Sequence, residues 1–136
     1  MVERVIISAV LLVAGLSIFY GYRYFQLWRV AALSSDTDEI RRRLQPGIPA
    51  IIYFTTPNCV PCRVQQQPAL RALQSEFGSE QLQIVQIDAT QEPEIASRWG
   101  VMTAPTTFIL DAGGTARTVN YGVADQSKLK HQLSVI

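Results

Sequence analysis

Two cysteines three residues apart, Cys59 and Cys62, are the only cysteines of the chain and its most reactive side chains. A thiolate attacks a disulfide, and a second thiol one helical turn away can resolve the mixed disulfide that forms. The spacing therefore predicts a dithiol that cycles with a disulfide, in which Cys59 attacks and Cys62 resolves.

The elements next to this pair place it at the turn between a strand and a helix. The apolar run 50–56 is typical of a buried strand, and the pattern after Cys62 predicts a helix that ends near Phe77. The first turn of a helix presents unpaired N–H groups and a partial positive charge, which favour a thiolate at Cys59. Pro61 suits a helix start because no N–H is needed there.

Three other uses of the cysteines stay open at this point. The pair can form a purely structural disulfide, or Cys59 can serve as a peroxidatic thiol, although no matching sequence context surrounds it. A zinc site needs about four ligands, and the chain offers only His131 and no second cysteine pair. We expect no bound metal and no organic cofactor.

Length and composition limit the possible classes of protein. The 136 residues, 48% of them hydrophobic, allow one domain with its own core plus an appendage. A formal net charge of +1 argues against a nucleic-acid binder, which usually carries a basic stripe. We expect residues 1–33 to form a membrane anchor with a juxtamembrane segment, and residues 34–136 to form the domain.

The anchor is predicted from residues 5–22, which lie between Arg4 and Arg23 and carry no charge. As a helix they span about 27 Å, close to the thickness of a bilayer's hydrocarbon core, which predicts a single-pass membrane protein. Trp28 and nearby aromatic residues alternate with Arg23 and Arg29, as at a membrane interface. By the positive-inside rule, these two arginines slightly favour a domain on the cytoplasmic side. The side of the membrane on which the domain lies is left open. A cleaved signal peptide and a buried soluble helix are the alternatives.

A short helix is predicted after the anchor. Asp36 and Glu39 can cap its start, and the arginines 41–43 lie near its end, as the helix dipole favours. We interpret the arginines as a solvated helix face, with anionic lipid or a partner as the alternative. Segment 46–49, Pro-Gly-Ile-Pro, then ends the helix.

The remaining chain alternates between strands and helices. In the helix after the cysteines, Leu70, Leu73 and Phe77 form the inward stripe, and Pro68 predicts a kink. Further elements are predicted from the periodicity of apolar residues and from residues that begin or end helices. Gly78 and Gly100 are expected to end helices, and Asp125 is expected to cap the last helix. They are strand 82–88, helix 91–99, strand 106–111, a fourth strand ending near Tyr121, and a final helix carrying Leu129, Leu133 and Ile136.

From about Ser35 to Ile136 the chain resembles the thioredoxin superfamily. Beyond the cysteine pair, the resemblance rests on four features, which are Ala104-Pro105-Thr106 before a strand, Asp88 at the end of a strand, Pro93 in a helix, and Gly122 after the fourth strand. It implies an α/β fold, a three-layer sandwich with a central mixed sheet, here preceded by the transmembrane helix. It also implies thiol–disulfide exchange with protein substrates and a protein partner that recycles the pair.

The resemblance further implies how a substrate is held. Pro105 is expected to have a cis peptide bond beside the cysteines, so that the backbone of Ala104 can bind an extended substrate chain. An ordinary trans proline at the start of a strand is the alternative. The substrate groove would be formed by Val60, Pro61, Ala104, Pro105, Gly122 and Val123.

The chain departs from the family pattern at four positions. Asn58 stands where reductases of the family usually have Trp, and Tyr53 stands where they have a buried carboxylate whose lysine partner is here Ile84. Pro68 lies one residue later than usual. A neutral phenol is a poor proton acceptor at pH 7, so we expect Cys62 to lose its proton to water or to the departing thiolate. A non-catalytic binding module with a structural disulfide is the alternative function.

Four further residues are given unremarkable roles. We expect Asp88 to cap its following loop rather than act as a base, and His131 to be solvated. Trp99 and Met102 are interpreted as core or groove packing. The direction of electron flow depends on the reduction potential of the pair and is not encoded in Val60 and Pro61.

Overall fold

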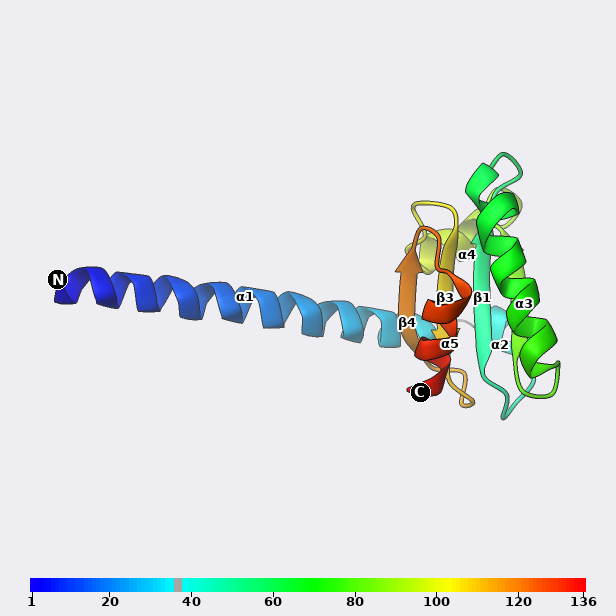
Figure 1. The fold of residues 1–136 in the computed structure, drawn as a ribbon, viewed down its shortest axis with the longest axis horizontal. Helices are drawn as coiled ribbons and strands as arrows, with labels where there is room; N and C mark the ends of the chain where they lie inside the picture. The colour runs from blue at the N-terminus through cyan, green and yellow to red at the C-terminus, as the bar shows by residue number, and fades with distance from the viewer. Residues whose placement is uncertain (36–37) are drawn as a thin grey trace.

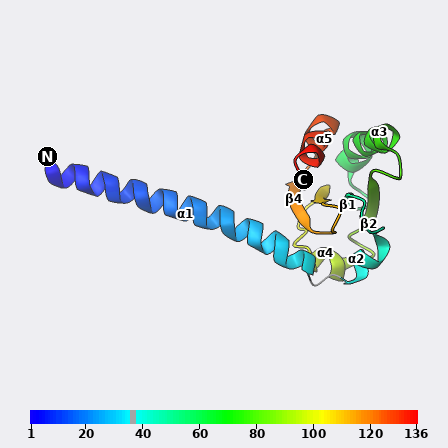
Figure 2. The same cartoon turned by 90° about the horizontal axis from the view of Figure 1, so that it is seen from below.

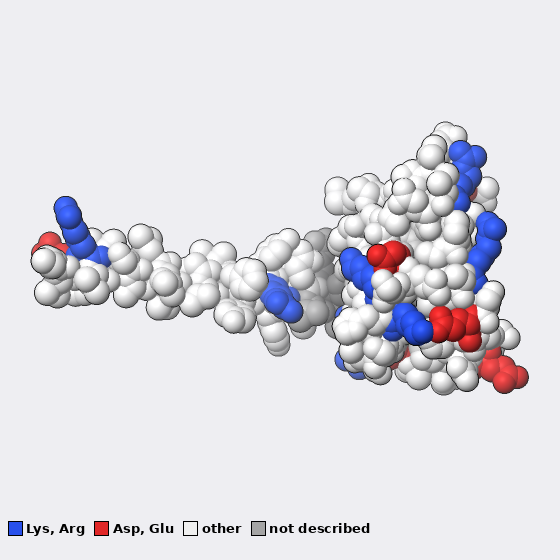
Figure 3. Space-filling model, in the orientation of Figure 1, with Lys and Arg blue, Asp and Glu red and all other residues white. Residues whose placement is uncertain are grey.

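The computed structural model, which describes residues 1–35 and 38–136, places one long helix before an α/β domain (Figure 1). This helix, α1 (Val2–Ser35), is 34 residues long. Its apolar stretch Val2–Gln26 has a mean hydropathy of 2.2 and is not buried against the rest of the protein. Figure 3 shows no charged side chain along most of its length. By length and composition it can cross a membrane, and a signal sequence passes the same test.

The domain is built on a mixed sheet of four strands in the order β2-β1-β3-β4. Its strands are β1 (Ala50–Thr55), β2 (Gln83–Asp88), β3 (Thr106–Leu110) and β4 (Ala116–Tyr121). β1 pairs with β2 in parallel, whereas β1 with β3 and β3 with β4 are antiparallel. The expected strands and the mixed sheet are therefore confirmed.

Helices cover both faces of this sheet. They are α2 (Asp38–Arg43), α3 (Gln67–Phe77) with the preceding π-helical turn η1 (Cys62–Gln66), α4 (Pro93–Arg98) and α5 (Gln126–Ser134). Figure 2 shows α3 and α5 on one side of the sheet and α2 and α4 on the other. The three-layer α/β/α sandwich expected from the sequence is confirmed.

The central strand β1 is buried on both faces, because its alternating residues feed two separate cores. Ile52 and Phe54 face α2 and α4, where Trp99 lies with its ring centroid 4.8 Å from that of Phe108. Trp99 is core packing, as predicted. On the opposite face Tyr53 joins the cluster that contains both cysteines and the apolar stripe of α3.

The predicted end of α3 and the predicted start of α5 agree with the structure, whereas α5 ends at Ser134, so the expectation that Ile136 lies on this helix is wrong. α3 ends at Phe77, and Gly78 follows with φ +73°, a conformation that glycine adopts without strain. Asp125 caps α5 and accepts a 2.8 Å hydrogen bond from the Lys128 N–H. The proposed cap at Asp36 lies outside the described residues.

One of the three arginines after α1 does more than contact solvent. Arg43 forms an ion pair with Glu92, at the start of α4, and a second one with Glu39 at 3.3 Å. The Arg43 guanidinium lowers the pKa of the Glu92 carboxyl. Residues 41–43 are exposed, in agreement with the interpretation as a solvated helix face, and Arg43 in addition links α2 to α4.

The disturbance expected at Pro68 takes the form of the π-helical turn before it. The Gln67 N–H donates to the carbonyl of Cys62, five residues earlier, whereas an α-helix joins residues that are four apart. The turn thus accommodates a proline one position later than the family pattern.

Candidate active site

Cys59 and Cys62 form a disulfide whose Cα atoms are 5.3 Å apart. They lie where the loop after β1 enters the helix, at the strand-to-helix turn predicted from the sequence. Cys59 is 8% exposed and Cys62 is 0% exposed. Cys59 is therefore the more exposed residue of the pair, and Cys62 is completely covered by protein.

The backbone of the turn is arranged to stabilise negative charge on Cys59. The Cys62 N–H donates a 3.2 Å hydrogen bond to Cys59 Sγ, and the Arg63 N–H bonds the Cys59 carbonyl. Cys59 thus occupies the position of a helix N-cap, with sulfur as the acceptor. When the disulfide opens, this N–H and the positive end of the helix favour a thiolate at Cys59.

Pro105 follows a cis peptide bond from Ala104, as the resemblance implied. Pro105 is buried, and Ala104 packs against the cluster that contains both cysteines. The Gly122 N–H donates a 2.8 Å hydrogen bond to the Pro105 carbonyl, with Gly122 at φ +89°. The chain thus brings the loop before β3 and the segment after β4 to the same end of the sheet as the cysteines.

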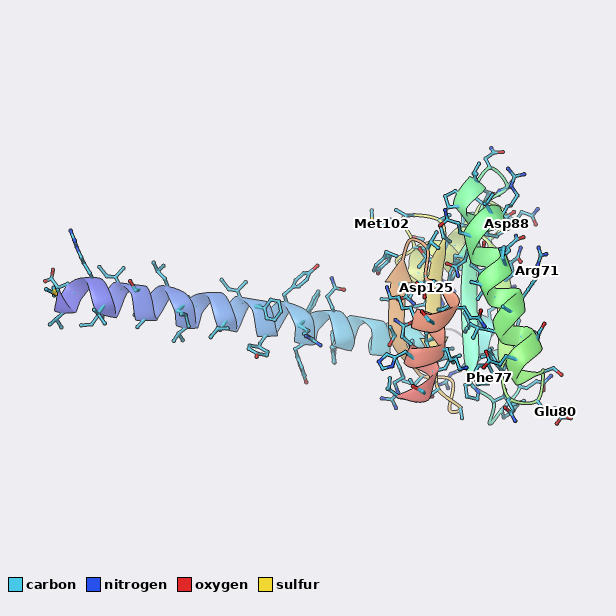
Figure 4. The ribbon with its side chains drawn as sticks, in the orientation of Figure 1. Arg71, Phe77, Glu80, Asp88, Met102 and Asp125 are labelled. Atoms are coloured by element: carbon cyan, nitrogen blue, oxygen red, sulfur yellow. A yellow bond between two sulfur atoms is a disulfide. The ribbon has the colours of Figure 1, made fainter. Side chains whose placement is uncertain are left out.

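The side chains around this end are largely apolar and open to solvent. Val60 and Pro61 are exposed next to Cys59, and Val123 is exposed directly after Gly122. Met102 is 91% exposed and projects from the loop between α4 and β3 (Figure 4). Met102 is therefore not core packing, because its loop places it outside the layers, and a position beside the groove stays a prediction.

Tyr53 occupies the place of the family's buried carboxylate, in the same cluster as Cys62. Its side chain is 1% exposed, and its hydroxyl has no hydrogen-bond partner within the described part of the protein. Burial raises the pKa of Tyr53, and this effect outweighs the opposite effect of the nearby Thr55 and Gln67 side chains, which lower the pKa. The phenol is neutral at pH 7 and is not a base for the Cys62 proton.

An open pocket of about 280 Å³ lies between α3 and the strands β1 and β2, and Tyr53 lines it. Arg71, which points outward from α3 in Figure 4, and Gln74 lie on the helix side. The full lining is Tyr53, Gln67, Leu70, Arg71, Gln74, Ile84 and Gln86. Cys62 is not part of this lining, so the route by which its thiol loses a proton, to water or to the departing thiolate, stays a prediction.

Asp88 caps the loop that follows β2. Its Oδ1 accepts hydrogen bonds from the Thr90 hydroxyl at 2.6 Å and the Thr90 N–H at 2.8 Å. These bonds lower the pKa of Asp88, so it is a carboxylate committed to the loop. The loop-capping interpretation is confirmed, and the exposed position of His131 agrees with its expected solvation.

Sequence reasoning missed one polar residue beside the site, Gln66. It is 0% exposed, at the end of η1, and its side-chain amide bonds the backbone of Ala124 after β4. The available signal was a glutamine on the inward stripe that also carries Leu70 and Leu73. A buried amide on such a stripe needs partners, but the sequence does not show where they lie.

The domain holds a cysteine pair at the start of a helix, with Cys59 more exposed than Cys62, on the same side as a loop with a cis-proline. This arrangement defines a thiol–disulfide oxidoreductase. Comparison with known proteins agrees, since the thioredoxin family model matches residues 33–134. The chain belongs to the thioredoxin family.

Individual relatives are similar over most of the domain. Thioredoxin 1 of Synechococcus elongatus is 30% identical over 90 residues, which are 66% of this chain and 82% of that protein. The Bacillus subtilis thioredoxin is 38% identical over 65 residues, 48% of this chain and 61% of that protein. Among solved structures, oxidised mitochondrial thioredoxin 3 of Saccharomyces cerevisiae matches with a TM-score of 0.61 at 23% identity, over 72% of this chain and 88% of that one.

Proposed function

We propose that this protein is a membrane-anchored thiol–disulfide oxidoreductase that exchanges disulfides with protein substrates. Residues 1–33 serve as anchor and juxtamembrane segment, and residues 34–136 as the catalytic domain. The observation that carries the proposal is the difference between the two sulfurs. Cys59 keeps some exposure to solvent and its Sγ accepts a hydrogen bond from a backbone N–H, whereas Cys62 is fully covered.

In the reductive direction, the Cys59 thiolate attacks one sulfur of a substrate disulfide. The Cys59–substrate bond forms, the substrate S–S bond breaks, and the first substrate thiolate leaves. Cys62 then loses its proton to water or to that thiolate and attacks Cys59 Sγ. The second substrate thiolate leaves, the substrate has gained two electrons, and the protein holds the Cys59–Cys62 disulfide. A recycling protein partner then restores the dithiol, and the potential of the pair against its compartment sets the direction.

The substrate chain lies in the groove formed by Val60, Pro61, Ala104, Pro105 and Gly122. Exposed apolar side chains next to Cys59 support this choice, because they offer contact area to an extended chain. The backbone of Ala104 precedes the buried Pro105 and supplies strand-like hydrogen bonds to the substrate.

Reduction of a protein disulfide such as that of insulin, with dithiothreitol as the electron source, tests the proposal. Wild type is expected to accelerate the reaction, and Cys59→Ser to remove the acceleration entirely. An inactive wild type with an intact, accessible disulfide would reject the enzyme and favour the binding module.

Membrane attachment is supported by α1, which is apolar and unburied over Val2–Gln26. A helix of that length spans about 37 Å, enough to cross the hydrocarbon core with some tilt. Alkaline extraction of expressing cells should leave the full-length protein in the membrane pellet at its uncleaved mass. A shortened, soluble product would identify residues 1–33 as a signal peptide instead. A topology reporter fused after Ile136 then assigns the side of the domain.

A further inference from the structure

The side chain of Gln66 connects the cysteine-bearing turn to the segment after β4. Its Nε2 donates to the Ala124 carbonyl at 3.0 Å, and its Oε1 accepts from the Ala124 N–H at 2.9 Å. The amide is 0% exposed, and so is Ala124. Both polar atoms of the side chain and both backbone groups of Ala124 are therefore satisfied by one another, out of contact with water.

The segment held in this way carries part of the proposed groove. Gly122 lies two residues before Ala124, and its N–H donates a hydrogen bond to the Pro105 carbonyl. Asp125, the residue after Ala124, caps α5. Ala124 also packs in the cluster with Cys59 and Cys62. The segment 122–125 is thus attached at three points, which are the cis-proline loop, η1 and α5.

Among these attachments, that of Gln66 is the one that joins the segment to the redox turn itself. Gln66 ends the π-helical turn that begins at Cys62. The hydrogen bonds cross 58 residues of sequence, so they do not follow from local chain geometry. Without them, the Ala124 N–H and carbonyl would be buried without partners, and the segment would gain stability by moving away to reach water.

We propose that Gln66 is a positioning residue for thiol–disulfide exchange, which holds segment 122–125 against the Cys59 turn and so fixes the width of the substrate groove. This inference rests on the function proposed above and adds a specific determinant of protein-substrate binding. Gln66 does not touch the reacting sulfur atoms in this role. It acts through the backbone of Ala124.

The first test compares Gln66→Leu with Gln65→Leu, which changes an exposed glutamine on the same turn. In Gln66→Leu we expect KM for a protein disulfide to rise about tenfold, equivalent to ~1.4 kcal/mol. Reaction with a small aromatic disulfide, which needs no extended groove, should change less than about twofold. Gln65→Leu should behave like wild type in both assays. Equal losses on both substrates, or none on either, would overturn the positioning role.

A second variant separates positioning from folding. In Gln66→Glu, the ionised carboxylate still accepts from the Ala124 N–H but repels the Ala124 carbonyl. The protonated acid can donate as the amide does. KM of this variant, as a ratio to wild type, should therefore return toward one as the pH falls below the pKa of the introduced acid. A ratio independent of pH would count against the proposal.

Amide hydrogen exchange reads the same contact without any activity. In Gln66→Leu, protection of the Gly122 and Ala124 amides should fall at least about tenfold, while that of the Phe108 amide in β3 stays unchanged. Unchanged protection at Gly122 would refute the positioning role even if the protein is active. Loss of protection in a protein without exchange activity would instead reject the proposed function and keep the contact.

Discussion

Replacing Tyr53 tests how the covered thiol of Cys62 loses its proton. Tyr53→Phe removes only the hydroxyl, which is buried and has no hydrogen-bond partner in the described chain. An unsatisfied buried hydroxyl costs about 1–3 kcal/mol, and a water molecule in the adjoining pocket can offset part of that cost. We therefore expect the free energy of unfolding to rise by about 1 kcal/mol, or roughly 4 °C in Tm for a domain of this size.

The same substitution should leave catalysis unchanged. Because burial raises the pKa of Tyr53, the phenol is protonated at pH 7 and accepts no proton from Cys62. Stopped-flow measurement of mixed-disulfide resolution at pH 7 should give the same rate for Tyr53→Phe and wild type, within about twofold. Urea denaturation measures the free energy of unfolding of both proteins, and an unchanged m-value shows that the two values can be compared.

Tyr53→Asp is the contrasting variant, because it places a carboxylate in the same cluster as Cys62. Burial raises the pKa of such a carboxyl toward neutrality and makes it a usable base, so resolution at pH 7 should become faster. Loss of the aromatic ring should cost about 3 kcal/mol of stability. The reasoning is refuted if Tyr53→Phe slows resolution several-fold or destabilises the domain by more than about 1 kcal/mol, since the hydroxyl would then have a catalytic or structural partner.

Three further predictions concern the scaffold and the groove. Leu73→Ala, at a fully buried position on the inward face of α3, should lower the free energy of unfolding by about 2–5 kcal/mol in urea titrations. The Arg43 hydrogen bond holds the pKa of Glu92 below its ordinary value of 4.5, so the stabilisation is present above that value and is lost as the pH falls through the lowered one. Glu92→Gln should therefore flatten the acid side of the stability profile by at most about 1 kcal/mol. Val60→Asp, at an exposed position next to Cys59, should raise KM for a protein disulfide several-fold and leave the unfolding free energy within about 0.5 kcal/mol of wild type.

The layers of the domain could be predicted from the sequence because its local signals agree with one another. The apolar run of β1, the inward stripe of α3 and the cap at Asp125 each specify one element, and all three appear in the structure. The cis bond at Pro105 was expected only through the family resemblance, since an isolated X-Pro pair does not reveal its isomer.

Contacts between distant residues could not be predicted in the same way. The partners Gln66 and Ala124 lie 58 residues apart, and Arg43 and Glu92 lie 49 apart, so no local pattern joins them. The exposure of Met102 likewise depends on the path of its loop, which its apolar character alone does not reveal. These features come from tertiary packing, which acts after the local elements are chosen.

The central claim, that Cys59 attacks and Cys62 resolves, is tested most directly by mapping the covalent intermediate. Cys62→Ser is incubated with a protein disulfide, quenched with acid, alkylated and digested for mass spectrometry. We predict a mixed disulfide through Cys59 that persists in Cys62→Ser and is absent from Cys59→Ser. A substrate bound through Cys62 in the Cys59→Ser protein, or no covalent species in Cys62→Ser, would contradict the account.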